Sequence, residues 1–384
     1  MKKSYLKIFS LIFVVLLLGV IFLPAKAPIV YAVNQESNCK SYVLIEKNTH
    51  NILEEKNAHD KLPIASVTKL MTTFLTLEKI EKNEIKLEDK IVVSENASGM
   101  GGSQIFLDEN CEYELKELLK SVIVASANDS SVALAEYIAG SENNFVKMMN
   151  EKAIELNMMD THYANCTGLP SNDGYSSAYD QAILLSHVQK YDIYHQYSSI
   201  WLEDFVHPSG RKTCMTNTNK LSKFYQGCTG GKTGSTNQAK YCLAVGAKRN
   251  GMELISVVLG ADSSQDRFKL ASDLLNFGFA NFKSKTLFSN ADLADKTIKI
   301  KGLDKHAELK AEKEFSIVCK LNEEINYTLN YNLPNSLTEV KENEHVGNVE
   351  IYLDGVLVDT INILSCSTIK GATIWDYFKE ITKN

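Results

Sequence analysis

Residues 63–77, PIASVTKLMTTFLTL, place a serine and a lysine one helical turn apart at the start of an apolar helical pattern. The apolar residues recur at the spacing of one helix face: Val67, Leu70, Met71, Phe74 and Leu77. Ser66 therefore lies near the helix N-terminus, where unpaired N–H groups and the helix dipole favour an anion. Lys69 follows on the same face, within reach of the Ser66 hydroxyl. Alternatively, Ser66 is only the N-cap, since Ser-x-x-Lys recurs at 4–7, 209–212 and 367–370 without this setting.

A second polar cluster, Ser126-Ala127-Asn128, separates two apolar stretches of helical period, 115–123 and 132–138. Polar side chains between two buried helices cost free energy unless they find hydrogen-bond partners. The cluster either contributes to a site or caps the second helix, and one residue can do both.

A third cluster, Lys232-Thr233-Gly234, occurs once in the chain and precedes two apolar runs at 241–246 and 252–259. Asn250-Gly251 joins these runs and is a strong signal for a hairpin turn. We expect the cluster on or beside the preceding strand, where Gly234 lets a ligand backbone approach closely.

Together the clusters supply two serine hydroxyls, two lysine amines and a carboxamide, which are the groups needed for acyl transfer by a lysine-activated serine. A lysine with an ordinary pKa of about 10.4 cannot accept the serine proton at neutral pH. We therefore expect burial and the charge of Lys232 to lower the pKa of Lys69. No H-E-x-x-H or C-x-x-C occurs, so neither a metal nor another cofactor is expected.

These segments resemble the serine D-alanyl-D-alanine carboxypeptidases, the low-molecular-weight penicillin-binding proteins (peptidase family S11). The resemblance is carried by Pro63–Thr72, Ala125–Asp129, Ser176–Asp180 and Gly231–Thr236, and it is close over about residues 40–282. It implies an α+β fold: a β-lactamase/transpeptidase-like domain, with an antiparallel sheet and helices on both faces, plus a small C-terminal all-β domain.

The resemblance also implies roles for individual residues. Ser66 is expected to be the acylated nucleophile and Lys69 its general base, while Ser126 relays a proton to the leaving group. Asn128 is expected to orient the substrate amide. The residues expected to bind the substrate are Lys232, Thr233, Gly234, Ser235 and Arg267. The backbone N–H groups of Ser66 and Ser235 are expected to form the oxyanion hole. Lys232 counts among the catalytic residues as well.

The substrates implied are peptidoglycan stem peptides, and β-lactams are expected to acylate Ser66 as mimics. A serine β-lactamase is the nearest alternative, and it needs efficient deacylation, often by a glutamate-activated water. Glu151 and Glu155 are interpreted as solvated helix residues. A non-catalytic cell-wall-binding protein on the same fold is the second alternative. A net charge of −6 argues against nucleic acid as a partner.

Residues 1–32 are interpreted as a signal peptide, because three lysines precede an apolar run at 8–23. An uncleaved anchor is the alternative, and both place the protein outside the cytoplasm, at the outer face of the membrane or in the cell wall. The catalytic domain is expected at 33–285 and a β-rich domain at 286–368, where short alternating segments begin. Residues 369–384 form a short amphipathic tail, either a peripheral membrane contact or a packing helix.

Overall fold

A five-stranded antiparallel sheet organises the first part of the chain in the computed structural model, which describes residues 38–376. The expected signal peptide and the end of the expected tail lie outside these residues. The strands are arranged in the order β2-β1-β9-β8-β7. Their bounds are Ser41–Glu46 (β1), Ile52–Lys56 (β2), Cys228–Thr236 (β7), Lys240–Arg249 (β8) and Met252–Ala261 (β9). Asn250 and Gly251 form the β8–β9 turn with positive φ angles, as predicted.

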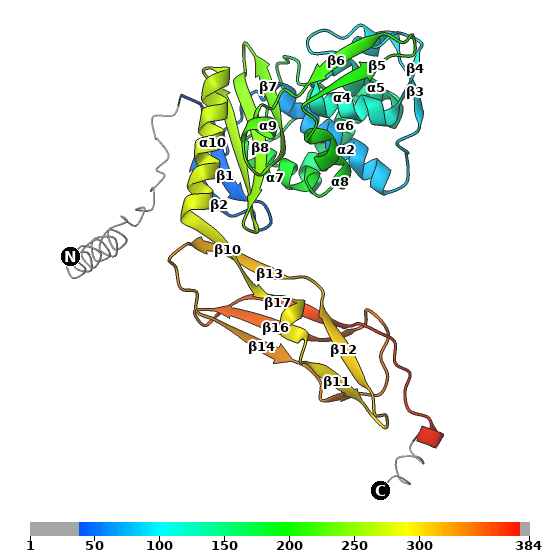
Figure 1. Ribbon diagram of the computed structural model, residues 1–384, viewed down its shortest axis with the longest axis vertical. Coiled ribbons are helices and arrows are strands. Elements are labelled where there is room, and N and C mark those ends of the chain that lie inside the picture. The colour runs from blue at the N-terminus through cyan, green and yellow to red at the C-terminus, as the bar shows by residue number, and fades with distance from the viewer. Residues whose placement is uncertain (1–37, 377–384) are drawn as a thin grey trace, which may run out of the picture.

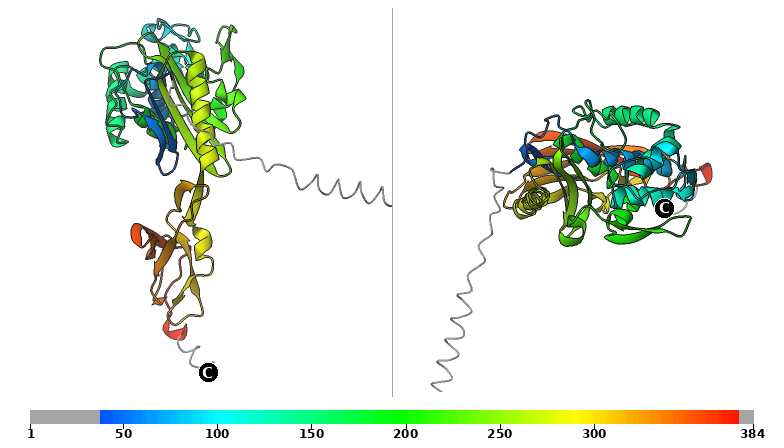
Figure 2. Two further views of the ribbon diagram at one scale, coloured as in Figure 1. Left: turned by 90° about the vertical axis from the view of Figure 1, so that its left-hand side faces the viewer. Right: turned by 90° about the horizontal axis from the view of Figure 1, so that it is seen from above.

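Both faces of this sheet are covered, as the apolar strands require (Figures 1 and 2). Because side chains alternate along a strand, Val43 and Ile45 enter one core while Tyr42 and Leu44 enter the other. Helix α10 (Ser264–Asn281) covers the second core, to which Leu221 of the short helix α9 also belongs. The longer helices pack on the opposite side. The bounds of the helices other than α10 are Ala65–Thr68 (η1, a 3₁₀ helix), Lys69–Glu81 (α2), Glu95–Ser98 (α3), Leu115–Val124 (α4), Asn128–Ala139 (α5), Glu142–Glu155 (α6), Ala178–Val188 (α7), Asp192–Ser198 (α8) and Leu221–Phe224 (α9).

Two small hairpins extend the helical side of the first part. They are β3 with β4 and β5 with β6, with bounds Lys90–Val92, Glu112–Glu114, Leu202–Val206 and Lys212–Thr216. The three polar clusters of the site lie elsewhere: at the junction of η1 and α2, between α4 and α5, and on β7.

A second, all-β part follows directly from α10, as Figure 1 shows. Strand β10 (Phe282–Phe288) pairs with β13 (Phe315–Lys320), and the remaining strands form a sheet in the order β14-β16-β17-β12-β11-β15. Their bounds are Thr297–Ile300 (β11), His306–Ala311 (β12), Tyr327–Asn332 (β14), Ser336–Leu337 (β15), His345–Leu353 (β16) and Val356–Ser365 (β17); a 3₁₀ turn, η2, spans Asn290–Leu293. This part has its own core, which includes Phe288, Val349 and Ile361.

The architecture confirms the expected fold class: an antiparallel sheet with helices on both faces, followed by an all-β domain. The expected boundary between residues 285 and 286 falls inside β10. At the other end, Ile369 pairs with Val340, whereas Ile374 and Trp375 each keep 76% of their surface exposed. Within residues 38–376, no helix is both long enough and apolar enough to cross a membrane.

Candidate active site

Ser66 and Lys69 meet at the junction of η1 and α2, as the sequence predicts. The Lys69 Nζ lies 3.0 Å from the Ser66 Oγ and donates a hydrogen bond of 2.6 Å to the Thr167 carbonyl. Ile64 is the residue that precedes η1, and the Ser66 side chain caps neither helix. The hydroxyl of Ser66 is therefore available to act as a nucleophile.

The Lys69 side chain, whose amine makes these two contacts, is completely buried. Burial lowers its pKa from 10.5 to about 7, so that about half of the amines are neutral at pH 7. Burial is the largest cause of this shift. Lys232 lies close enough for the two ammonium charges to repel, and because such a repulsion acts on both groups, it also disfavours the charged form of Lys69, as expected. A neutral Lys69 can accept the proton of Ser66.

Lys232 forms a second amine–hydroxyl pair, with Ser126. Its Nζ donates to the Ser126 Oγ at 2.7 Å and to the Thr233 carbonyl at 3.0 Å. The pKa of Lys232 is well below its ordinary value because the amine is buried and because Lys69 and Arg267 lie nearby. Strand β7 thus brings Lys232 to the turn between α4 and α5, which is far away in sequence.

Asn128 does not cap α5 with its side chain: the N-cap residue is Ala127 and no side-chain bond is made there. Instead, the Asn128 Nδ2 donates to the Gly101 carbonyl at 2.6 Å and the Asn128 N–H donates to the Ser103 carbonyl at 2.7 Å. Its Oδ1 is buried and has no hydrogen-bond partner anywhere in residues 38–376. A buried acceptor without a partner is rare and would gain a hydrogen bond from any N–H donor that reaches it.

Asp129, the next residue, holds the loop that Asn128 contacts. Its carboxylate accepts hydrogen bonds of 3.1 Å from the N–H groups of Ile105 and Leu107. Asp129 is fully buried, and this burial raises its pKa although the backbone donors oppose the shift. Residues 101–107 are therefore fixed to the start of α5.

Thr218 is a site residue that the sequence did not reveal. The Thr233 hydroxyl donates to the Thr218 Oγ1 at 2.8 Å, and the Thr218 N–H donates to the Val124 carbonyl at 3.2 Å. Thr218 thereby connects β7 to the end of α4. The run of short polar residues at 216–219 was the available signal, but such runs are also typical of exposed loops.

Gly234 allows a close backbone approach, but the approaching backbone belongs to the protein itself. A Cβ atom at this position would lie 2.6 Å from the Ile64 carbonyl oxygen and 2.9 Å from the Ser66 nitrogen. The strand is therefore pressed against the segment that carries the nucleophile. The exposed Ser235 follows next on the same strand, so its N–H and that of Ser66 lie in adjacent segments.

Arg267 lies behind this strand, near the start of α10, with 8% of its surface exposed. Its Nη1 donates to the carbonyls of Gly234 at 2.9 Å and Cys242 at 3.2 Å. Its guanidinium also lies over the rings of Tyr241 and Phe268. Arg267 therefore supports β7 from behind and contributes positive charge close to Lys232.

Comparisons with known proteins identify the family of this chain. Residues 29–263 match the family described as D-alanyl-D-alanine carboxypeptidase, and residues 282–370 match the penicillin-binding protein 5 C-terminal domain. The D-alanyl-D-alanine carboxypeptidase DacF of Bacillus subtilis is 42% identical over 75% of this chain and 74% of its own length. DacC of Escherichia coli is 29% identical over 94% of this chain and 93% of its own.

A solved structure shows the same similarity. Penicillin binding protein 5 from Haemophilus influenzae superposes with a TM-score of 0.70 at 28% identity, covering 88% of this chain and 99% of that one. The likeness therefore extends over both parts of the molecule. With the family match over more than half of its length, the chain belongs to the D-alanyl-D-alanine carboxypeptidase family.

Proposed function

We propose that this enzyme removes the terminal D-alanine from peptidoglycan stem peptides through an acyl-enzyme on Ser66. One observation carries the proposal: the Ser66 hydroxyl contacts a buried amine, Lys69, whose pKa of about 7 lets it take a proton at neutral pH. The relatives named D-alanyl-D-alanine carboxypeptidase supply the substrate class.

In the acylation step, the Ser66 Oγ attacks the carbonyl carbon of the penultimate D-alanine while its proton moves to Lys69. The N–H groups of Ser66 and Ser235 stabilise the oxyanion. Ser126 then relays this proton from Lys69 to the amine of the departing D-alanine: it gives its own proton to the amine and takes the proton held by Lys69. Lys232 orients the Ser126 hydroxyl through their 2.7 Å hydrogen bond. Water later hydrolyses the ester, which restores Ser66 and releases the shortened peptide.

The terminal carboxylate of the substrate binds at the Lys232 side of the site. Thr218 supplies a hydroxyl donor there: because its Oγ1 accepts the hydrogen of the Thr233 hydroxyl, its own hydrogen remains available to a carboxylate. Thr233 binds the substrate indirectly, by holding the Thr218 hydroxyl in this orientation. Arg267 contributes charge from behind Gly234. The partnerless Asn128 Oδ1 accepts the N–H of the substrate amide. β-Lactams carry a comparable carboxylate and acylate Ser66 as substrate mimics.

The structure offers little support for the β-lactamase alternative. The loop at 164–175, whose Thr167 carbonyl accepts from Lys69, contains no glutamate to activate a water. Glu155 is held by Lys152 at 2.6 Å, and its side chain keeps 65% of its surface exposed. We therefore expect a long-lived penicillin adduct.

The decisive experiment measures D-alanine release from a synthetic stem pentapeptide alongside labelling by fluorescent penicillin. Wild-type protein should do both, and Ser66→Ala should do neither while keeping its unfolding midpoint. Rapid penicillin turnover without D-alanine release would favour the β-lactamase. A folded wild-type protein that neither labels nor releases D-alanine would favour the non-catalytic alternative.

We also propose that residues 1–32 direct export and that residues 369–384 contact the outer face of the membrane. Deletion of residues 371–384 should release the protein from the membrane fraction. Unchanged fractionation would contradict the membrane contact.

A further inference from the structure

The loop at 164–175 supplies the acceptor that orients the general base. In the proposed function, on which this inference rests, Lys69 takes the proton of Ser66. The Lys69 Nζ donates to the Thr167 carbonyl at 2.6 Å and lies 3.0 Å from the Ser66 Oγ. A neutral amine has two hydrogens and one lone pair, so that with one hydrogen on the Thr167 carbonyl the lone pair can face the Ser66 hydroxyl. The position of this carbonyl therefore bears directly on proton transfer.

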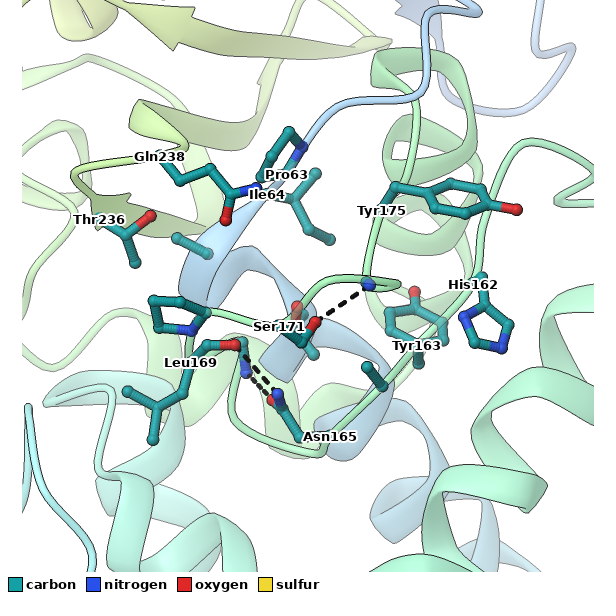
Figure 3. A pocket seen from close by; sticks show the side chains of 16 residues that line it. Pro63, Ile64, His162, Tyr163, Asn165, Leu169, Ser171, Tyr175, Thr236 and Gln238 are labelled. Atoms are coloured by element: carbon teal, nitrogen blue, oxygen red, sulfur yellow. Dashed lines mark hydrogen bonds between the residues drawn. The ribbon is translucent and has the colours of Figure 1, made fainter.

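The backbone around Thr167 has a defined shape. The Asn165 side chain accepts from the Thr167 N–H at 3.2 Å. It also accepts from the Gly168 N–H at 2.6 Å and donates to the Leu169 carbonyl at 3.0 Å (Figure 3). A Cβ at Gly168 would lie only 2.0 Å from a carbonyl oxygen of the nucleophile segment, so this backbone packs closely there. These contacts set the local shape, whereas the placement of the loop in the domain also depends on the helices around it.

Two helices hold this part of the loop through side chains. On α6, Asn150 pairs with both backbone groups of Tyr163: its Nδ2 donates to the carbonyl at 2.9 Å and its Oδ1 accepts from the N–H at 2.8 Å. Glu142, the first residue of α6, accepts from the Cys166 N–H at 3.1 Å. On α2, the Thr72 hydroxyl donates to the Cys166 carbonyl at 2.7 Å. Both backbone groups of Cys166 are thus bound by helix side chains.

Cys166 directly precedes the residue whose carbonyl binds Lys69, and it is completely buried. Burial, followed by the charge of Glu142, raises the pKa of its thiol well above the usual range, so the thiol stays neutral. Within residues 38–376, the titratable groups that face Lys69 are this thiol, the Asp129 carboxyl group and the Lys232 amine. Glu142 therefore acts on the base through the backbone of the loop.

We propose that Glu142 is a positioning residue for the general base: by holding the Cys166 N–H, it keeps the neighbouring Thr167 carbonyl in contact with the amine. Glu142 takes no part in the proton transfer itself. Its removal frees one anchor of a backbone segment that also covers Lys69. Water should then reach the amine, which weakens the desolvation that lowers its pKa. More of the amine should consequently be protonated at neutral pH.

The test measures the rate of acylation by fluorescent penicillin from pH 6 to pH 9. Glu142→Ala should move the midpoint of the pH profile upward by about one pH unit, which lowers the rate about tenfold at pH 7, including about twofold from poorer alignment, but only about twofold at pH 9. Glu142→Gln keeps an acceptor oxygen for the Cys166 N–H and should restore the wild-type midpoint. Glu155→Ala, at the exposed far end of α6, is the matched control and should keep both rate and midpoint.

A second variant guards against misfolding of Glu142→Ala. Thr72→Val has nearly the same shape but no hydroxyl to donate to the Cys166 carbonyl, and it should also move the midpoint upward. An unchanged midpoint in both variants, or a shift in Glu142→Gln as large as in Glu142→Ala, would overturn the positioning role. If the folded wild-type protein is acylated at no pH, the proposed function fails instead, and with it the base that Glu142 is assigned to position.

Discussion

Replacing Lys69 by methionine should abolish acylation and at the same time make the protein more stable. The side chain has a similar length but cannot carry a proton. In the wild type, folding transfers this amine into a fully buried position, which lowers its pKa from 10.5 to about 7. Because the unfolded chain binds the proton more tightly, the buried amine destabilises the native state at neutral pH.

The magnitude follows from the two pKa values. A shift of roughly 3.5 units corresponds to about 5 kcal/mol below pH 7, and to about 4 kcal/mol at pH 7, where half of the buried amines are neutral. Methionine also leaves the Thr167 carbonyl without its 2.6 Å donor, which costs about 1–3 kcal/mol. The net expectation is a gain of about 1–3 kcal/mol in unfolding free energy at pH 7.

The pH dependence of the unfolding free energy tests independently whether Lys69→Met stabilises the protein. Between the folded pKa of about 7 and the unfolded pKa of 10.5, the unfolded chain alone holds the proton, so wild-type stability rises with pH. The advantage of Lys69→Met should therefore shrink by about 2 kcal/mol between pH 7 and pH 9. Urea unfolding of both proteins at the two pH values measures this. A variant less stable than wild type at pH 7, or one that still labels with penicillin, would refute the reasoning.

The remaining predictions concern the rest of the site. Penicillin acylation should rise about tenfold from pH 6 to pH 8 as Lys69, with a pKa of about 7, loses its proton; a flat stopped-flow profile would contradict this. Gly234→Ala should slow acylation at least about 100-fold, because the added Cβ would lie 2.9 Å from the Ser66 nitrogen. Penicillin labelling at the wild-type rate would show that β7 can move to accommodate the added methyl group. Thr218→Val should raise KM for the pentapeptide about tenfold with little change in kcat, and an unchanged KM would remove Thr218 from carboxylate binding. Arg267→Gln should lower kcat/KM through KM, and normal steady-state kinetics would contradict a role for its charge.

The elements of the site were largely predictable because each has a local signal. The helical period after Ser66 predicted the one-turn separation of Ser66 and Lys69, and Asn250-Gly251 predicted the β8–β9 hairpin, which lies next to β7 in the sheet. In the second domain, Asp354-Gly355 likewise forms the turn between β16 and β17. Short-range periodicity and turn chemistry report on the backbone within about ten residues.

The contacts between elements were harder to predict because they depend on how separate segments pack. Thr218 reaches Thr233 only because residues 217–219 cross from the hairpin of β5 and β6 to the end of α4. The acceptor for Lys69 is the backbone carbonyl of Thr167. Because every residue has a backbone carbonyl, the residue type at this position could not identify it. The role of Asp129 in holding residues 101–107 was likewise hidden, since a buried carboxylate and a helix-capping one look alike in sequence.

The backbone itself explains why three distant segments converge on one hydroxyl. Ala65 and Ser126 adopt φ angles of 48° and 64°, which cost roughly 1–3 kcal/mol each for residues that carry a Cβ. Ala65 precedes Ser66, and Ser126 is itself a serine of the candidate site; neither conformation is favourable in an isolated helix or turn. The cores around α2, α4 and α5 must therefore supply the energy that holds them. Gly168 and Gly234 then contact the nucleophile segment through backbone atoms, without rotatable side chains between them. The position of Ser66 is accordingly set by the folded domain as a whole, and its catalytic geometry arises only when that domain is complete.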